Sequence, residues 1–330
     1  MLISDFTYEL PEERIAKFPP EERGTTRLLV LNRKTGEIKD SRYKDIVDYL
    51  NSGDVLILND TRVMQSRVFC TLPDGRKREI VVLEKHGDEP QHVMYRGKLH
   101  EGDILNPGEI KVTKILGNGI AEVESKTPLA DLAEKYGTVP LPPYLHRDAT
   151  EEDKKRYQTI WAKNMGSAAA PTASLNMTKE TLEKLKKKGV VVKYVTLHVG
   201  LGTFLPIRTE KIEDHQIHTE WYSIPEDTIK AIGDVEARKA RIVALGTTVA
   251  RTLEYYAKSG KATGEADIFI YPGYEFKLVD ALLTNFHAPK STVLMLASAF
   301  AGWDHLKHAY EHAIDKKYDF LSYGDSMFIC

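Results

Sequence analysis

The sequence predicts an α/β domain that carries an inserted antiparallel β-barrel domain. Three observations support this: strand-like and helix-like segments alternate before residue 63, they alternate again after residue 150, and short strands fill the interval. Alternating strands and helices favour a largely parallel sheet, whereas closely spaced short strands favour a small barrel or sandwich. We therefore expect residues 1–63 and 150–330 to form a discontinuous α/β catalytic domain, and residues 64–149 to form the inserted domain with its linker.

The first sixty residues contain two apolar runs that are typical of strands, at residues 28–31 and 54–58. A turn at residues 34–36 and apolar residues at helical spacing over residues 43–50 separate the two runs. The second run leads directly into the polar cluster at residues 59–62. A strand and its polar end are therefore expected here.

The middle of the chain has a different pattern. Its strand-like runs lie at residues 67–72, 79–84, 92–95, 110–116 and 120–123, between turn sequences such as Pro-Asp-Gly and Gly-Asn-Gly. This spacing predicts the barrel. Proline-rich residues 138–144 then predict an extended linker, because proline fixes φ and disfavours helix in the residue before it.

The α/β pattern returns after residue 150. A helix is expected over residues 179–188 and a strand over residues 190–198. A second strand, residues 241–245, ends in Gly-Thr-Thr and leads into a helix over residues 250–257. A third strand is expected at residues 268–271.

Polar and glycine residues that follow these strands predict a ligand pocket. Ligands in open α/β sheets bind outside the carboxyl ends of the strands. Glycines permit close approach of the backbone, and threonine hydroxyls can contact ribose or carboxylate groups. The expected pocket residues are His198, Gly200, Gly202, Thr203, Gly246, Thr247, Thr248, Tyr271 and Tyr274.

Composition and charge argue against several other classes of protein: nonspecific nucleic-acid binders, membrane-spanning proteins and secreted disulfide-rich proteins. The 330 residues are 42% hydrophobic and 28% charged, as in ordinary globular proteins, and the net charge of −2 argues against a surface built for nonspecific nucleic-acid binding. Neither a membrane-spanning run nor a signal peptide is expected. Two cysteines, Cys70 and Cys330, make no disulfide framework, so we expect a cytoplasmic protein.

Cofactor signals are weak. Gly200-Leu-Gly202 follows a strand, but Leu205 takes the place of the third glycine in a dinucleotide fingerprint. His215, His218 and Glu220 would suit a metal-dependent hydrolase, although His-x-x-His is a common accident and a structural role is favoured. We expect no metal and no cofactor.

Seven sequence blocks resemble those of one family. They are Asn59-Asp-Thr-Arg-Val63, Tyr157-Gln-Thr159, Gly166-Ser-Ala-Ala-Ala-Pro-Thr-Ala173, Leu197-His-Val-Gly-Leu-Gly-Thr-Phe204, Ile268-Phe-Ile-Tyr-Pro-Gly-Tyr-Glu-Phe276, Thr284-Asn-Phe-His287 and Tyr323-Gly-Asp325. In sequence and order they are similar to the S-adenosylmethionine:tRNA ribosyltransferase-isomerase family of queuosine biosynthesis. The resemblance spans nearly the whole chain and also implies an α/β domain with an inserted barrel.

The resemblance implies a reaction in which S-adenosylmethionine is a substrate. Its ribosyl part would be transferred to the aminomethyl group of a 7-deazaguanine at the tRNA wobble position and rearranged to the epoxycyclopentane of epoxyqueuosine, releasing adenine and methionine. The expected partners are therefore S-adenosylmethionine and a tRNA anticodon loop, whose bases can be splayed outward, and we expect a monomer.

This chemistry needs a base for the C5′ proton beside the sulfonium and an acid to assist the departure of adenine. The catalytic candidates are His198, His287, Asp325 and Asp60. The further candidates for substrate contact, beyond the pocket residues above, are Arg62, Arg251, Lys290 and Asn176.

Two departures from the family pattern leave alternatives open. After Ala173 the family continues Gly-Leu-His-Phe, whereas this chain has Ser174-Leu-Asn176-Met177, and asparagine cannot shuttle a proton near neutral pH. The barrel segment Tyr95-Arg-Gly-Lys-Leu99 replaces an Arg-Pro segment that basic residues follow. A divergent paralogue with another acceptor, the metal-dependent hydrolase and a non-catalytic RNA-binding protein are the alternatives.

Overall fold

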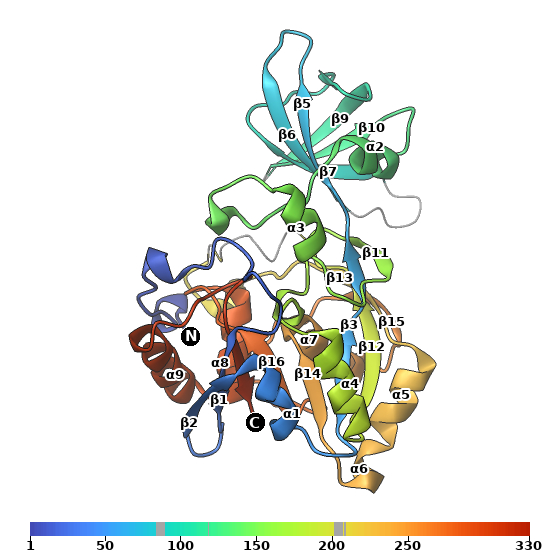
Figure 1. The fold of residues 1–330 in the computed structure, drawn as a ribbon. Coiled ribbons are helices and arrows are strands. Elements are labelled where there is room, and N and C mark those ends of the chain that lie inside the picture. Colours follow the sequence, from blue (N-terminus) through green and yellow to red (C-terminus); the bar gives the residue numbers. More distant parts are fainter. Residues whose placement is uncertain (84–89, 118, 201–206, 208) are drawn as a thin grey trace.

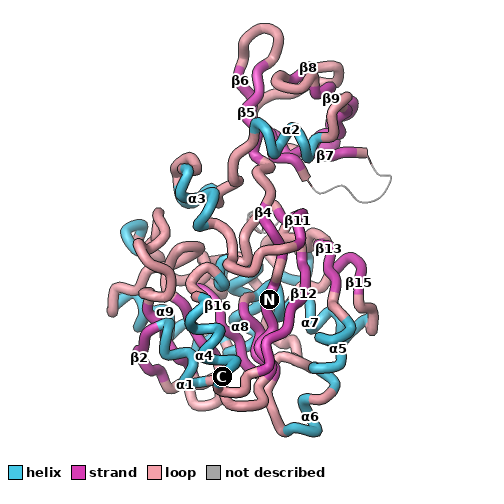
Figure 2. The backbone as a smooth tube through the Cα atoms, turned by 45° about the vertical axis from the view of Figure 1, so that its right-hand side comes forward, coloured by secondary structure: helices cyan, strands magenta, loops and turns pink. Residues whose placement is uncertain are grey.

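The computed structural model describes residues 1–83, 90–117, 119–200, 207 and 209–330, and two large β-sheets dominate it. In Figure 1 the six-stranded sheet stands above the nine-stranded sheet, and Figure 2 shows the same separation from another side. The strand order of the larger sheet is β15-β13-β12-β3-β14-β16-β17-β1-β2. None of the helices in the described part of the chain is long and apolar enough to span a membrane.

The centre of the nine-stranded sheet is parallel and its flanks are antiparallel. The parallel centre consists of β12 (Val191–Leu197), β3 (Val55–Asn59), β14 (Ile242–Leu245) and β16 (Ala281–Asn285). The flanking strands are β13 (Glu220–Ser223), β15 (Thr263–Ala266), β17 (Ser326–Ile329), β1 (Arg27–Leu31) and β2 (Ile38–Arg42). Strands β1 and β17 pair in parallel, but β17 runs antiparallel to β16. The expectation of a largely parallel sheet is therefore correct only for the centre.

Helices cover both faces of this sheet because successive side chains of a strand point to opposite faces. On β3, Val55 and Ile57 belong to one apolar cluster, and Leu56 and Leu58 belong to the other. The first cluster includes residues of α5 (Glu226–Gly233), α6 (Val235–Arg238), α7 (Thr247–Ser259), α8 (Thr292–Ala301) and α9 (Trp303–Asp315). The second includes residues of α1 (Ile46–Tyr49) and α4 (Lys179–Lys187).

The six-stranded sheet is an antiparallel barrel. Its order is β5 (Arg67–Thr71), β6 (Lys77–Val82), β7 (Gln91–Arg96), β10 (Ile120–Glu124), β9 (Ile110–Gly117) and β8 (Ile104–Leu105). A bridge between Thr71 and Asn106 joins the two edges, and α2 (Leu129–Tyr136) packs Leu129 and Leu132 into the barrel core. An α/β fold with an inserted antiparallel barrel is thereby confirmed.

The connections between the two sheets are short elements. Strands β4 (Thr61–Val63) and β11 (Asn164–Ser167) form a parallel pair, and α3 (Glu151–Arg156) follows the linker at residues 138–144. In Figure 1, α3 lies between the barrel and the larger sheet.

Two expected elements differ in the structure, and the end of a third lies outside the described residues. Residues 268–271 form no strand: they follow β15, bury Ile268 and Ile270 without joining the ladder, and the carbonyl of Ile268 accepts a hydrogen bond from Arg251 instead. Residues 43–50 form a short 3₁₀ turn followed by α1 rather than one helix. The end of the run at residues 79–84 lies outside the described residues at Glu84.

Candidate functional site

A cavity of about 510 Å³ lies at the carboxyl edge of the larger sheet, where β14 and β16 end. Its volume suits a small-molecule substrate. The turns after β14 and β16, residues 169–173 and the loop after α9 supply most of its wall. The polar lining residues are Tyr144, Thr172, Thr247, Thr248, Thr284, Asn285, His287, Lys290, Ser291 and Ser322.

The amino end of α7 faces this cavity without a side-chain cap. Gly246 is the N-cap residue and has φ of +97°. Because it has no side chain, it cannot accept a hydrogen bond from the N–H groups of the first helical turn, as a serine hydroxyl would. The first backbone N–H groups of a helix attract anions, so this end is suited to a carboxylate. At α8, by contrast, the Ser291 hydroxyl caps the N–H of Leu294. Of these two helix ends at the cavity, that of α7 is the one without a side-chain cap.

The turn after β16 places His287 in the cavity wall. Its backbone N–H donates to the Tyr310 hydroxyl at 2.9 Å, and its carbonyl accepts a hydrogen bond from the Tyr8 hydroxyl. Nε2 lies 3.1 Å from the Thr284 hydroxyl. Nδ1 has no hydrogen-bond partner among the described residues, which leaves this atom available to a ligand.

Burial lowers the pKa of His287 to about 3, far below the ordinary value of a histidine. The ring is therefore neutral near pH 7. A neutral imidazole can accept a proton or a hydrogen bond, but it holds no spare proton to donate as an imidazolium. The same burial that removes the proton needed for the acid role also makes the ring a weaker base, so the choice between the two roles stays a prediction.

Several other side chains fix the wall near this turn. Thr172 donates to the Oδ1 of Asn285 at 3.0 Å, and both residues line the cavity. The hydroxyls of Tyr144 and Ser322 lie 2.5 Å apart. The sequence singled out none of these four as site residues, although Asn285 and Thr172 fall within blocks of the family pattern.

His198 and Asp60 lie outside the cavity lining among the described residues. The ring of His198 stacks on Trp221 with 5.1 Å between centroids, and its Nδ1 lies 2.7 Å from the Thr61 hydroxyl. Asp60 accepts hydrogen bonds from Thr196 and Asn164. Both side chains thus have structural partners, and their catalytic roles stay predictions.

Arg251 is buried and is used within the fold. It forms an ion pair with Glu220 and donates to the backbone carbonyls of His218, Ala266 and Ile268. Burial raises the pKa of Glu220. Among the described residues, His215, His218 and Glu220 included, no group of three His, Cys, Asp or Glu side chains lies close enough to hold a metal ion.

The remaining substrate-contact candidates also lie away from the described lining. Tyr274 donates to Glu254, and Tyr271 packs against Phe269. Arg62 is exposed on β4. The N–H of Gly200 donates to Glu220 at 2.9 Å, and the expected residues Gly202 and Thr203 lie outside the described residues.

Asp325 and the residues that depart from the family pattern lie behind the wall rather than in it. Asp325 and Asn176 are 5% and 3% exposed, and both bond within the fold. Met177 is fully buried, and the Ser174 hydroxyl is buried without a hydrogen-bond partner in the described structure. Ser174, Asn176 and Met177 therefore lie outside the described lining of the cavity.

Comparisons with known proteins cover the whole chain. A family model described as "Queuosine biosynthesis protein" matches residues 3–329. The chain belongs to this family. Members from Chlorobium phaeobacteroides and Pelodictyon phaeoclathratiforme, both named S-adenosylmethionine:tRNA ribosyltransferase-isomerase, are 54% and 52% identical to it over the full length of both chains.

The family assignment extends to a solved structure. The crystal structure of S-adenosylmethionine tRNA ribosyltransferase from Thermotoga maritima matches with a TM-score of 0.59 and 35% identity, over 99% of this chain and 100% of that one. This queuosine biosynthesis family member is therefore an enzyme of the ribosyltransferase-isomerase class, and the non-catalytic alternative is wrong.

Proposed function

We propose that this enzyme transfers the ribosyl moiety of S-adenosylmethionine to 7-aminomethyl-7-deazaguanine at the wobble position of a tRNA anticodon loop. The products are epoxyqueuosine in the tRNA, adenine and methionine. The enzyme consumes S-adenosylmethionine as a substrate, uses no cofactor, and acts as a monomer in the cytoplasm. The observation that carries this proposal is a cavity of about 510 Å³ at the carboxyl edge of a full-length family member.

The lining residues suit the parts of S-adenosylmethionine. The uncapped amino end of α7 receives the methionine carboxylate, and Lys290 at the rim adds positive charge. The hydroxyls of Thr247 and Thr248 contact the ribose. Together, these contacts to the carboxylate and the ribose hold the nucleoside against the turn that carries His287.

His287 acts on the ribosyl carbon beside the sulfonium. The positive sulfur acidifies the C5′ hydrogens, and we assign the removal of one of them to Nδ1 of His287, which lies in the cavity wall without a hydrogen-bond partner among the described residues. The bond between adenine and C1′ then breaks, and protonation of adenine assists its departure. His287 cannot also be the initial acid, because its low pKa leaves it without that proton.

An assay of turnover tests the proposal. The enzyme is incubated with S-adenosylmethionine and tRNA carrying the aminomethyl-deazaguanine, and released adenine and the tRNA nucleosides are measured by mass spectrometry. The matched control is the same tRNA with guanine at the wobble position. We expect one adenine for each epoxyqueuosine formed, and none with the control.

Two results would count against the proposal in different ways. Binding of S-adenosylmethionine without adenine release from the modified tRNA would favour a divergent paralogue with another acceptor. Absence of S-adenosylmethionine binding to folded protein would reject the cavity assignment.

A further inference from the structure

The loop at residues 319–325 forms one wall of the cavity. It follows α9 and leads into β17, and its residues Leu321 and Ser322 line the cavity. The N–H of Leu321 donates to the carbonyl of Phe286 at 3.1 Å. The position of this loop therefore sets the shape of the site beside His287.

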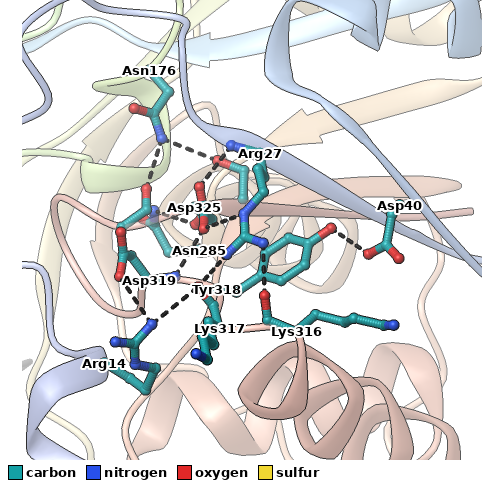
Figure 3. Close-up of polar contacts among 12 residues, drawn as sticks. Arg14, Arg27, Asp40, Asn176, Asn285, Lys316, Lys317, Tyr318, Asp319 and Asp325 are labelled. Carbon is teal, nitrogen blue, oxygen red and sulfur yellow. Dashed lines mark hydrogen bonds and ion pairs between the residues drawn. The ribbon is translucent and has the colours of Figure 1, made fainter.

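Asp325 joins the two ends of the loop by hydrogen bonds and lies outside the cavity lining. Its backbone N–H donates to the Asp319 carbonyl at 2.8 Å, and its carboxylate accepts the N–H of Asp319 at 2.8 Å and the N–H of Arg27 at 2.6 Å. The Arg27 guanidinium lies 3.4 Å from the same carboxylate and 3.8 Å from the centre of the Tyr318 ring. Figure 3 shows this carboxylate at the centre of the cluster.

Two amide side chains hold the end of the loop. Asn176 donates to the carbonyl of Gly324 at 2.9 Å and to the hydroxyl of Ser326 at 3.2 Å (Figure 3). Asn285, which lines the cavity, donates to the carbonyl of Asp325 at 3.4 Å. A buried donor that bonds a loop carbonyl stabilises one position of the loop, because the carbonyl would otherwise be left unpaired.

The turn itself is tight. A Cβ added at Gly324 would lie 2.4 Å from the carbonyl oxygen of Asp319, closer than real contacts allow. The turn therefore requires glycine at this position. Buried side chains of the loop add to its inner hydrogen bonds: Phe320 packs against Phe286, and the Tyr323 hydroxyl donates to Asp153.

We propose that Asp325 and Asn176 are positioning residues, which fix the loop at residues 319–325 as a preformed wall of the cavity. Neither residue touches the ligand. This inference rests on the proposed function for the identity of the ligand, S-adenosylmethionine. It gives Asp325 a role other than that of an acid or base, and it gives Asn176 a role in which no proton is transferred.

A preformed wall affects substrate binding more than the chemical step. If the loop is loosened, S-adenosylmethionine must order it on binding, so part of the binding free energy is lost. The dissociation constant and the KM for S-adenosylmethionine then rise, while kcat changes little because the bound complex regains the same wall. A purely structural role would instead lower the amount of active enzyme and leave KM unchanged.

The test compares Asp325→Asn with a matched control, Asp54→Asn. Asp54 is 2% exposed and accepts the N–H groups of Asn51 and Arg241 and the Arg241 guanidinium, but it lies before β3 at the opposite edge of the sheet. A third variant, Asn176→Leu, removes the donor to Gly324 at similar volume. Each protein is measured for S-adenosylmethionine affinity by calorimetry, for KM and kcat from adenine release, and for amide exchange at residues 321–324.

We expect D325N and N176L to raise the dissociation constant and KM about tenfold, to change kcat less than threefold, and to speed amide exchange at residues 321–324. D54N should lose comparable thermal stability and keep affinity within twofold. Unchanged affinity and exchange in D325N, or an equal loss of affinity in D54N, would overturn the inference. If the wild-type protein binds no S-adenosylmethionine, the proposed function fails, and amide exchange alone decides whether the two residues fix the loop.

Discussion

Two aspartate–arginine pairs with similar hydrogen bonds lie at opposite ends of the strands of the nine-stranded sheet, Asp54 at the amino ends of the central strands and Asp325 at their carboxyl ends. Asp54 accepts the backbone N–H and the guanidinium of Arg241 before β3, and Asp325 accepts the same two groups of Arg27 before β17. The partners of Asp54 belong to turns that lead into strands, whereas the partners of Asp325 include the loop that lines the cavity. The comparison shows that a buried ion pair does not by itself mark a functional site. The segment that the pair holds in place decides its importance.

The largest effect is expected at the carboxyl edge, from His287→Ala. Loss of the neutral imidazole removes the proposed base, so adenine release should fall at least 100-fold, which corresponds to about 2.7 kcal/mol of activation free energy. The control is His305→Gln on α9, where the ring contacts the Arg33 carbonyl and is not part of the described lining. Equal activity in H287A and the wild type would remove His287 from the mechanism.

The two ends of α7 give the next comparison. Gly246 and Gly260 both have positive φ, at +97° and +69°, so alanine should destabilise the protein at either position. The cost is about 1 kcal/mol at Gly260, in the left-handed helical region, and about 1–3 kcal/mol at Gly246, whose ψ of 156° belongs to a region almost restricted to glycine. Only Gly246→Ala also places a methyl group at the cavity, 3.5 Å from the Cβ of Ala173. G246A should therefore weaken S-adenosylmethionine binding about tenfold in a titration, and G260A should not. Equal affinities would contradict the assignment of the carboxylate to α7.

Acid should destabilise the protein partly through His287. Its pKa of about 3 in the folded state lies below the value near 6.5 expected in the unfolded chain, so the unfolded state binds more protons between these values. The neutral ring contributes up to a few kcal/mol to the free energy of unfolding. This contribution is fully present above about pH 6.5 and is lost as the pH falls towards 3. The free energy of unfolding of His287→Gln, measured with denaturant from pH 7 to 4, should fall less steeply than that of the wild type. Parallel curves would show that the ring is not buried in its neutral form.

The smallest effect is expected at Ser174, two residues from Asn176. Its hydroxyl is buried without a partner in the described structure, unlike the Asn176 amide, which donates two hydrogen bonds. Ser174→Ala should therefore leave activity unchanged and raise stability by up to about 1 kcal/mol in thermal unfolding. A clear loss of stability would indicate a partner for this hydroxyl.

Local patterns in the sequence were sufficient for part of this account. The apolar run before Gly246-Thr-Thr248 predicts a strand that ends in three site residues, and the structure places all three in the cavity wall. The same reasoning was wrong at residues 268–271, because alternating burial arises there from packing without a ladder partner. Periodicity reports which side chains are buried, and it does not report what pairs with the backbone.

The surroundings of Asp325 could not be predicted in this way. Its carboxylate meets Arg27, which is 298 positions away in the chain, and its carbonyl meets Asn285. Such contacts depend on the order of strands in the sheet, in which β17 is inserted between β16 and β1. The sequence identified the residue as a site candidate but not its position behind the wall.

The most direct measurement is a crystal structure of the enzyme with S-adenosylhomocysteine, which keeps the nucleoside and the carboxylate of the substrate. We predict that the ligand occupies the cavity at the carboxyl edge, with its carboxylate at the amino end of α7 and its C5′ beside His287. A ligand bound away from this cavity, for example in the small pocket beside His215 and Arg251, would contradict the account.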